Sequence, residues 1–288
     1  SSSSASTPRS ARPMAYNLAD LHVHSFCSDG LRTPTQAVEE ARNAGVRALS
    51  LTDHDTVSGI EEASCAGSEL GVEVVPGTEL SAHVDDREVH LLAYFLDWQS
   101  LALGDYLSVL RQRRRERGEA MVERLNELGV SITVKEVLDH ANGGLVARPH
   151  IAAAMIGSGA VTTKEEAFDR YIGDRGPAVV HKRRCPARDV IDLVHSQGGV
   201  AFLAHPGKRL PVTVVSRLVD AGLDGLEVFH PAHQPPQMEH YTKLAKRYDL
   251  LQSGGSDSHG DPDGSRIGDC GIGCEAIEAM TARAAEYA

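Results

Sequence analysis

Two histidines stand at spacing i, i+2 in the run Asp20-Leu-His22-Val-His24. If this run is a strand, both imidazoles point to the same face and can approach a single metal ion. The chain holds 14 histidines in 288 residues, so about 0.7 such pairs are expected by chance and the pair alone is a weak signal. Further ligands must come from elsewhere in the chain before a metal site is indicated.

Histidine, aspartate and glutamate recur where later strands are expected. They occur in Asp53-His54-Asp55, at Glu79, at His90, in His205-Pro206-Gly207 and in Ser256-Asp257-Ser258-His259. In a parallel α/β architecture the carboxyl ends of the strands open on one rim, where active sites gather. Taken singly, each residue is explained at least as well as a helix cap or a solvated loop side chain. Five strands that all carry such residues indicate one shared site.

Short β-rich runs alternate with amphipathic stretches and supply the strands that this site needs. The expected strands are 18–24, 47–52, 72–77, 88–95, 199–205, 225–229 and 250–253. Strands separated by helices predict an α/β fold with a parallel sheet or barrel. The first helix is the best marked, because Thr33 can cap it, Pro34 suits its first position, Gln36 completes a capping box and Gly45 ends it.

The alternation stops between the fourth and fifth strands. The segments 100–128, 133–140, 148–157 and 163–171 carry helical patterns only, which we interpret as a helical insertion at one end of the sheet. We therefore expect a barrel domain built from 14–98 and 185–288, and an insertion domain at 99–184 that sets substrate specificity. A last helix is expected at 275–287, and residues 1–13 are expected to form a disordered leader.

Six motifs along the chain resemble, in order, those of the polymerase and histidinol phosphatase (PHP) family of metal-dependent phosphoesterases. They are DLHVHSFCSDG, LTDHDTVSG, GTELS, VHLLAYF, AHPG and GSDSH. With its insertion, the whole pattern is most similar to nucleoside 3',5'-bisphosphate phosphatases and related 5'-to-3' exoribonucleases. The resemblance implies a distorted (β/α)7 barrel that binds up to three divalent metal ions, with manganese favoured and iron or zinc as alternatives.

The resemblance also implies nine metal ligands. The first ion would be held by His22, His24, Glu79 and Asp257, the second by Glu79, His90 and His205, and the third by Asp29, His54 and His259. Some relatives carry histidine at the position of Asp29, and an oxygen ligand there favours manganese over zinc. Asp20 would orient a ligand rather than bind metal.

Hydrolysis at such a centre needs no protein nucleophile. Two ions can lower the pKa of a shared water to give hydroxide near neutrality, and a third can neutralise charge on the phosphate oxygens. The chain has no GxSxG nucleophile elbow and no strong candidate for a thiolate loop. The leaving alkoxide needs a proton, and His233 is the catalytic candidate for supplying it, with plain contact to substrate as an equally good alternative.

Five arginines stand within the seven residues 111–117. On a helix Arg111 shares a face with Arg115, and Arg114 with Arg117, so some must face solvent. An exposed face with local glutamate pairs and contact with substrate by a subset are equally good readings. The resemblance favours phosphate binding, which the planar guanidinium suits. The expected substrate-binding residues are Thr35, Arg111, Arg114, Arg148, His181, Lys208 and Arg209.

These expectations combine into hydrolysis of a phosphate monoester of nucleoside 3',5'-bisphosphates, such as 3'-phosphoadenosine 5'-phosphate (pAp) to AMP, with 5'-3' trimming of short RNA as a second activity. A histidinol phosphatase or cyclic phosphodiesterase of the same family would share the metals but not the distal arginines. A non-catalytic metal-binding module is a third alternative, against which the intact ligand series counts.

Charge and cysteine content limit the partners and the compartment. The 29 basic and 40 acidic residues give a net charge of −11, which argues against coating duplex DNA or a membrane through bulk charge. The longest apolar run, 91–96, is far short of the roughly 18 residues that span a bilayer. The five cysteines form no CxxC pair, which favours the reduced cytoplasm. We expect a small phosphorylated nucleotide or short RNA as partner and no obligate protein partner.

Overall fold

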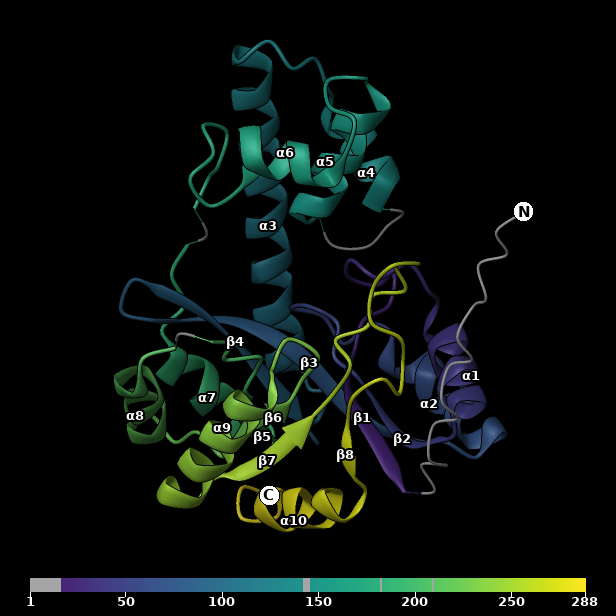
Figure 1. Cartoon of the computed structure of the whole chain (residues 1–288), viewed down its shortest axis with the longest axis vertical. Coiled ribbons are helices and arrows are strands. Elements are labelled where there is room, and N and C mark those ends of the chain that lie inside the picture. The colour runs from purple at the N-terminus through teal and green to yellow at the C-terminus, as the bar shows by residue number, and fades with distance from the viewer. Residues whose placement is uncertain (1–16, 142–145, 182, 209) are drawn as a thin grey trace, which may run out of the picture.

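The computed structural model describes residues 17–141, 146–181, 183–208 and 210–288. One mixed sheet of eight strands curves round in the order β7-β6-β5-β4-β3-β2-β1-β8 (Figure 1). The segment after β7 lies beside β1, where the backbone N–H of Asp257 donates to the carbonyl of His22 at 2.8 Å, so the sheet nearly closes into a barrel. The strands are β1 (Leu18–Val23), β2 (Val46–Leu51), β3 (Glu73–Val84), β4 (Arg87–Tyr94), β5 (Val200–Leu203), β6 (Gly225–Phe229), β7 (Leu251–Gly254) and β8 (Ile272–Gly273).

The α/β barrel is confirmed, but two strand predictions were incomplete. The sequence reading missed β8, two residues long, which pairs antiparallel with β1. It also ended β3 at residue 77, whereas the strand runs on to Val84 and forms a hairpin with β4. Asp85 takes a φ of 54° in the two-residue turn, a conformation that aspartate tolerates in tight hairpins.

The direction of β4 matters for the site. This strand is antiparallel to both β3 and β5, so the barrel is not wholly parallel. Its first half, rather than its carboxyl end, reaches the rim where β1, β2 and β5 end. His90 lies in that half and pairs in register with Ser81 of β3. The antiparallel strand thereby delivers a mid-strand histidine to the same mouth.

Six helices surround the barrel: α1 (Pro34–Ala44), α2 (Ile60–Leu70), α7 (Ala187–Ser196), α8 (Val212–Asp220), α9 (Pro235–Tyr248) and α10 (Glu275–Ala284). Helix α1 begins and ends as predicted, with the Thr33–Gln36 capping box and a left-handed Gly45. Helix α10 covers the bottom of the barrel (Figure 1), where Ile277 and Met280 pack with the buried rings of Tyr94 and Phe202. It ends at Ala284, three residues before the predicted limit.

The helical insertion rises from the opposite end of the barrel (Figure 1). It comprises α3 (Leu101–Glu127), α4 (Val134–Ala141), α5 (Arg148–Gly157), α6 (Lys164–Ala167) and a π-helix (Phe168–Ile172). The first half of α3, through Leu103 and Leu107, packs into the barrel-side core. Its second half, through Met121 and Leu125, packs against α5 in a separate core. One long helix therefore belongs to both regions.

No helix in the described ranges is both long and apolar enough to cross a bilayer.

Candidate metal centre

His22 and His24 meet at the end of β1. Both side chains are fully buried, and their Nε2 atoms are 3.1 Å apart. The two-residue period of the strand places them on one face, as the sequence predicted. They form the inner wall of the candidate centre.

Glu79 occupies the middle of the site. Its carboxylate comes from β3, is 1% exposed and lies against five imidazoles. Oε2 is 3.3 Å from Nε2 of His22, 3.3 Å from Nε2 of His24 and 3.1 Å from Nδ1 of His54, and Oε1 is 2.8 Å from Nδ1 of His90 and 2.9 Å from Nε2 of His205. A carboxylate with its two oxygens turned to different histidines has the geometry that a bridging ligand needs.

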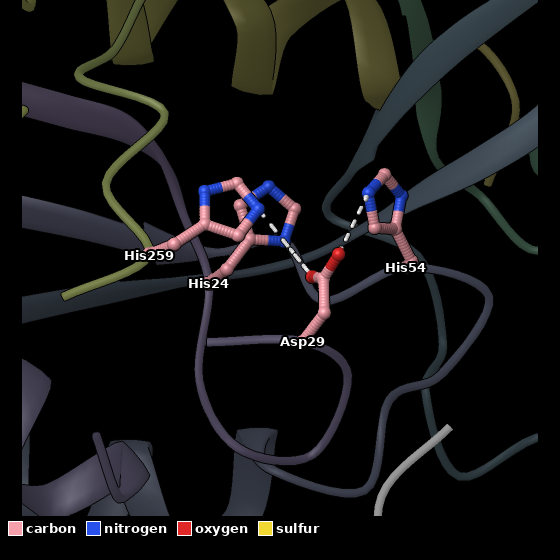
Figure 2. Close-up of side chains that lie close together, drawn as sticks. All are labelled: His24, Asp29, His54 and His259. Carbon is pink, nitrogen blue, oxygen red and sulfur yellow. Dashed lines mark ion pairs between the residues drawn. The ribbon is translucent and has the colours of Figure 1, made fainter. Parts of the chain in front are cut away.

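Two aspartates complete the cluster. Oδ1 of Asp257 is 3.1 Å from Nε2 of His24 and 3.3 Å from Nε2 of His22. Asp29 lies on the other side, with Oδ1 3.4 Å from Nε2 of His259 and Oδ2 4.0 Å from Nε2 of His54. Figure 2 shows Asp29 facing the three histidines: His24 stands on the same segment after β1, and His54 and His259 come from two other segments. All nine residues expected as ligands therefore gather in one place.

Several backbone conformations in the cluster are strained. His205 and Asp257 take φ values of 25° and 51°, in a region that residues other than glycine rarely adopt. Such strain persists where the surrounding structure fixes the side chain, and it concentrates at functional sites.

The donor atoms form overlapping groups of the size that a metal ion requires. Within each group the ligand atoms lie within 4.8 Å of one another: His24, Asp29, His54 and His259; His22, His205 and Asp257; His22, His24 and Glu79; and His54, Glu79 and His90. All four differ in part from the ligand sets implied by the resemblance, and the first adds His24 to the implied set of Asp29, His54 and His259. His24 occurs in two groups, because its Nε2 faces Glu79 and its Nδ1 faces Asp29.

One buried atom tests whether a cation fits. Nδ1 of His24 is inaccessible to solvent and has no hydrogen-bond partner among the described residues, and it lies 3.9 Å from Oδ1 of Asp29. A buried polar atom without a partner is costly. That separation is too long for a hydrogen bond but suits a cation bound at about 2.1 Å to each atom. Imidazole nitrogen with carboxylate oxygen is compatible with manganese, iron or zinc.

The carboxylates of the cluster stay charged. Burial opposes ionisation of Glu79, but the neighbouring imidazoles of His54, His90 and His22 outweigh it and hold its pKa well below the usual range. Burial likewise opposes ionisation of Asp257, and the charge of His22 with hydrogen bonds from nearby imidazoles lowers the pKa well below its ordinary value. The site is therefore a concentration of fixed negative charge, which favours cations.

The imidazoles respond in opposite ways. Burial works against protonation of His24, but hydrogen bonds to Asp257 and Glu79 raise its pKa to about 10. Burial dominates at His54 and lowers its pKa to about 3, despite the nearby charges of Glu79 and Asp29. His54 is thus ready to offer a lone pair, whereas a cation has to displace the proton of His24.

Glu227 of β6 belongs to the site and was missed by the sequence reading. Its side chain is fully buried, Oε1 accepts from Nδ1 of His22 at 2.9 Å and Oε2 accepts from the backbone N–H of His205 at 2.6 Å. It fixes the ring of His22 so that Nε2 faces the cluster. A lone carboxylate in the apolar strand 225–229 was the available signal.

Asp20 has the orienting place that the resemblance implied. Its two oxygens accept from the backbone N–H groups of Ser256 and Gly268, each at 2.8 Å. Burial raises its pKa to about 6 in spite of these hydrogen bonds. Asp20 therefore holds the loop that carries Asp257.

His233, the predicted catalytic histidine, has both ring nitrogens engaged. It is 2% exposed, Nδ1 donates to the carbonyl of Val228 at 2.9 Å and Nε2 accepts from the N–H of Gly207 at 3.0 Å. This arrangement ties two loops together and leaves no ring proton for a leaving group. His230 instead turns its Nε2 to Asp257 at 3.3 Å.

The predicted substrate-binding residues are spread more widely than expected. Arg111 is exposed on α3 and does not line the cavities beside the cluster. The hydroxyl of Thr35 donates a hydrogen bond to Oε1 of Glu62 in α2 at 2.7 Å. Lys208 is exposed, and Arg209 lies outside the described residues. Arg114 is paired with Asp55, because its Nε donates to Oδ2 of Asp55 at 2.7 Å.

Two cavities lie close to the cluster. One, of about 260 Å³, borders Asp55, the residue that follows His54, and its polar lining also includes Ser81, Arg113, Arg114, Glu116, Arg117, His181 and Arg183. The other, of about 360 Å³, lies between His90, His205 and Arg148. Burial, together with the charges of Arg114 and Arg148, lowers the pKa of Arg117 to about 10. Positive charges are therefore crowded next to the anionic centre, as an anionic ligand would require.

The barrel and the cluster at its mouth are those of a metal-dependent hydrolase, and comparison with known proteins gives the family. The model of the PHP domain matches residues 20–204. The chain belongs to the PHP family and is a phosphoesterase, a hydrolase of phosphate esters.

Three of the curated relatives are named for different activities. The chain is 34% identical over 249 residues to the 5'-3' exoribonuclease Rnm of Salmonella typhimurium, covering 83% of this chain and 84% of the relative. It is 35% identical over 252 residues to the phosphoribosyl 1,2-cyclic phosphate 1,2-diphosphodiesterase of Eggerthella lenta, covering 84% and 94%. It is 31% identical over 253 residues to the 3',5'-nucleoside bisphosphate phosphatase of Chromobacterium violaceum, covering 86% and 89%.

Solved structures agree on the fold. A metal-dependent phosphoesterase from Bifidobacterium adolescentis superposes with a TM-score of 0.86 at 32% identity, covering 92% of this chain and 96% of that one. The insertion is therefore part of the shared architecture.

Proposed function

We propose that the chain hydrolyses a phosphate monoester of nucleoside 3',5'-bisphosphates, for example pAp to AMP and phosphate, and that it also trims short RNA from the 5' end. The observation that carries this proposal is the juxtaposition of the nine-residue cluster around Glu79 with a cavity lined by arginines. One site suits the reacting phosphate, and the other suits a second anionic group of the same substrate. The activities named for the Salmonella and Chromobacterium relatives support this substrate class.

The nine ligands would hold divalent cations, for which we propose manganese. When bound, such ions activate water and neutralise charge on the reacting phosphate. Glu227 keeps His22 in the orientation that faces the cluster, and Asp20 keeps the loop of Asp257 in place. We propose that His233 positions the Gly207 loop rather than donating a proton.

Specificity would come from the helical insertion, residues 99–184. Arg113 and Arg117 of α3 and His181 line the cavity of about 260 Å³. Guanidinium groups bind phosphate through paired, charge-assisted hydrogen bonds. We propose that these residues bind the phosphate that is not hydrolysed, and that Arg148 adds charge in the neighbouring cavity.

A cyclic phosphodiesterase is the second candidate, because the Eggerthella relative bears that activity in its name. It would use the same cluster, but the arginine cavity would then bind a monophosphate of a ribose. Four arginines, Arg113, Arg114, Arg117 and Arg183, line this one cavity, and only Arg114 among them is paired with Asp55. This concentration of positive charge favours a more highly charged substrate.

Product analysis tests the proposal. Metal-free protein is assayed with and without added manganese on pAp, AMP, a 1,2-cyclic ribose phosphate and a 5'-phosphorylated oligoribonucleotide. We expect manganese-dependent release of inorganic phosphate from pAp and of nucleoside 5'-monophosphates from the oligoribonucleotide, little phosphate release from AMP, and a loss of more than about a hundredfold in both activities in an equally pure Glu79→Gln variant. Turnover of the cyclic phosphate alone would establish the second candidate, and no turnover of any substrate would refute the proposal.

A further inference from the structure

A buried ion pair connects the insertion to the metal centre. Arg114 of α3 donates from Nε to Oδ2 of Asp55 at 2.7 Å and from Nη2 to the hydroxyl of Ser81 at 3.3 Å. The side chain of Arg114 is 10% exposed and that of Asp55 is 2% exposed. Most of this guanidinium is therefore committed to protein groups rather than to solvent or ligand.

Asp55 in turn fixes the backbone next to a metal ligand. Its Oδ1 accepts from the N–H of Ser81 at 2.9 Å, and its own N–H donates to the carbonyl of Glu79 at 2.9 Å. It takes a φ of 47°, a conformation that the surroundings must enforce. The backbone of the preceding residue, His54, forms an isolated parallel β-bridge with that of Glu79. The side chain of His54 faces Asp29 (Figure 2).

A phosphate that drew Arg114 away from Asp55 would break this ion pair. That exchange would take the guanidinium away from a carboxylate that is 2% exposed, and weakening the pairing of a buried charge is unfavourable. Burial works against the charged form of Arg114, but the charge and hydrogen bond of Asp55, together with the charges of Asp29 and Glu88, outweigh it and raise its pKa. Arg114 thus has a carboxylate as its main charged neighbour, whereas the charged neighbours of Arg117 include two other arginines, Arg114 and Arg148.

We propose that Arg114 is a positioning residue, through which α3 holds Asp55 and thereby sets the place of His54 in the metal centre. The helix that supplies the substrate arginines would then also fix one metal ligand. This inference rests on the proposed metal centre, and it replaces the expectation that Arg114 binds phosphate directly.

The test uses Arg114→Met, Asp55→Asn and the double variant. Manganese binding to the metal-free proteins is measured by isothermal titration calorimetry. We expect the weakest site to lose about tenfold in affinity in each single variant, as is typical when a partner of a metal ligand is removed, with no further loss in the double variant. Arg115→Met is the matched control, because Arg115 is exposed on the same helix and pairs only with Glu119 among the contacts found for it.

A kinetic readout separates positioning from substrate contact. If Arg114 acts through His54, excess manganese restores the KM for pAp in Arg114→Met to within a few-fold of the parent value. Unchanged manganese affinity with a raised KM at every manganese concentration would overturn the inference and return Arg114 to the substrate site. If Arg114→Met does not fold, the nearly isosteric Asp55→Asn decides by the same two measurements. Failure of the parent protein to bind manganese would instead refute the metal centre itself.

Discussion

The metal cluster and the arginine-bearing face of α3 are both strongly charged, but they are built in opposite ways. The cluster draws its side chains from loops and strands far apart in the chain, and Glu79 alone touches five imidazoles. The arginines come from one continuous helix and fan out from it: Arg114 is buried against Asp55, Arg113 and Arg117 line a cavity, and Arg111 and Arg115 face solvent. Each side chain of the cluster is held in place by contacts with the others. The arginines of α3, by contrast, point in different directions and have different roles.

The largest effect is expected at the point of convergence. Glu79→Gln removes the charge that all five imidazoles share, so kcat for phosphate release should fall by more than about a hundredfold, beyond the range for residues that only support ligands. Activity is measured at saturating manganese, with circular dichroism as the folding control. A folded variant with near-parent activity would contradict the role of Glu79 as the carboxylate on which the cluster depends.

A smaller loss of activity is expected when a residue that supports a metal ligand is changed. Glu227→Gln keeps the shape beside His22 but loses the carboxylate charge, so manganese affinity should fall by about 10–100-fold. Raising the manganese concentration should restore much of the activity. The measurement is the manganese dependence of kcat. A loss that no manganese concentration rescues would place Glu227 in the reaction itself.

The arginine face should show selectivity rather than total loss. Arg117→Gln should raise the KM for pAp by about tenfold or more, because a hydrogen bond to a charged group contributes about 1.5–3 kcal/mol. The KM for a monophosphate should not change. Arg111→Gln, from the exposed face of the same helix, should leave both values alone. Equal effects of the two substitutions would show that α3 acts only through its general charge.

The smallest effect is expected away from both regions. Thr33→Ala removes the capping hydroxyl of α1, which should cost about 1 kcal/mol of stability and lower Tm by about 2–4 °C. Calorimetry measures the shift, and kcat should stay at the parent value. A loss of activity here would mean that the cluster depends on helices that do not touch it.

Sequence reasoning succeeded where a local rule fixes the outcome. Thr33, Gln36 and Gly45 delimit α1 because capping depends on neighbours in sequence. The strand-end histidines and acids converge because strand direction places them on one rim. The rule was incomplete at two positions. Glu79 lies within β3, which continues to Val84, and His90 reaches the mouth from the middle of the antiparallel strand β4.

It was incomplete where tertiary packing decides. The face of α3 that Arg114 occupies depends on Asp55, almost sixty residues earlier in the chain, and spacing within the helix cannot reveal that partner. Glu227 was missed because its role lies in supporting His22 and not in a motif of its own. His233 stands in a suggestive His-rich loop, yet its two hydrogen bonds to Val228 and Gly207 engage both ring nitrogens.

Anomalous diffraction at the manganese edge, from crystals grown with manganese, tests the central claim most directly. We expect peaks within coordination distance of His22, His205 and Asp257, with Glu79 contacting more than one ion. Peaks confined to other parts of the surface, or a cluster whose side chains bind no metal at all, would contradict it.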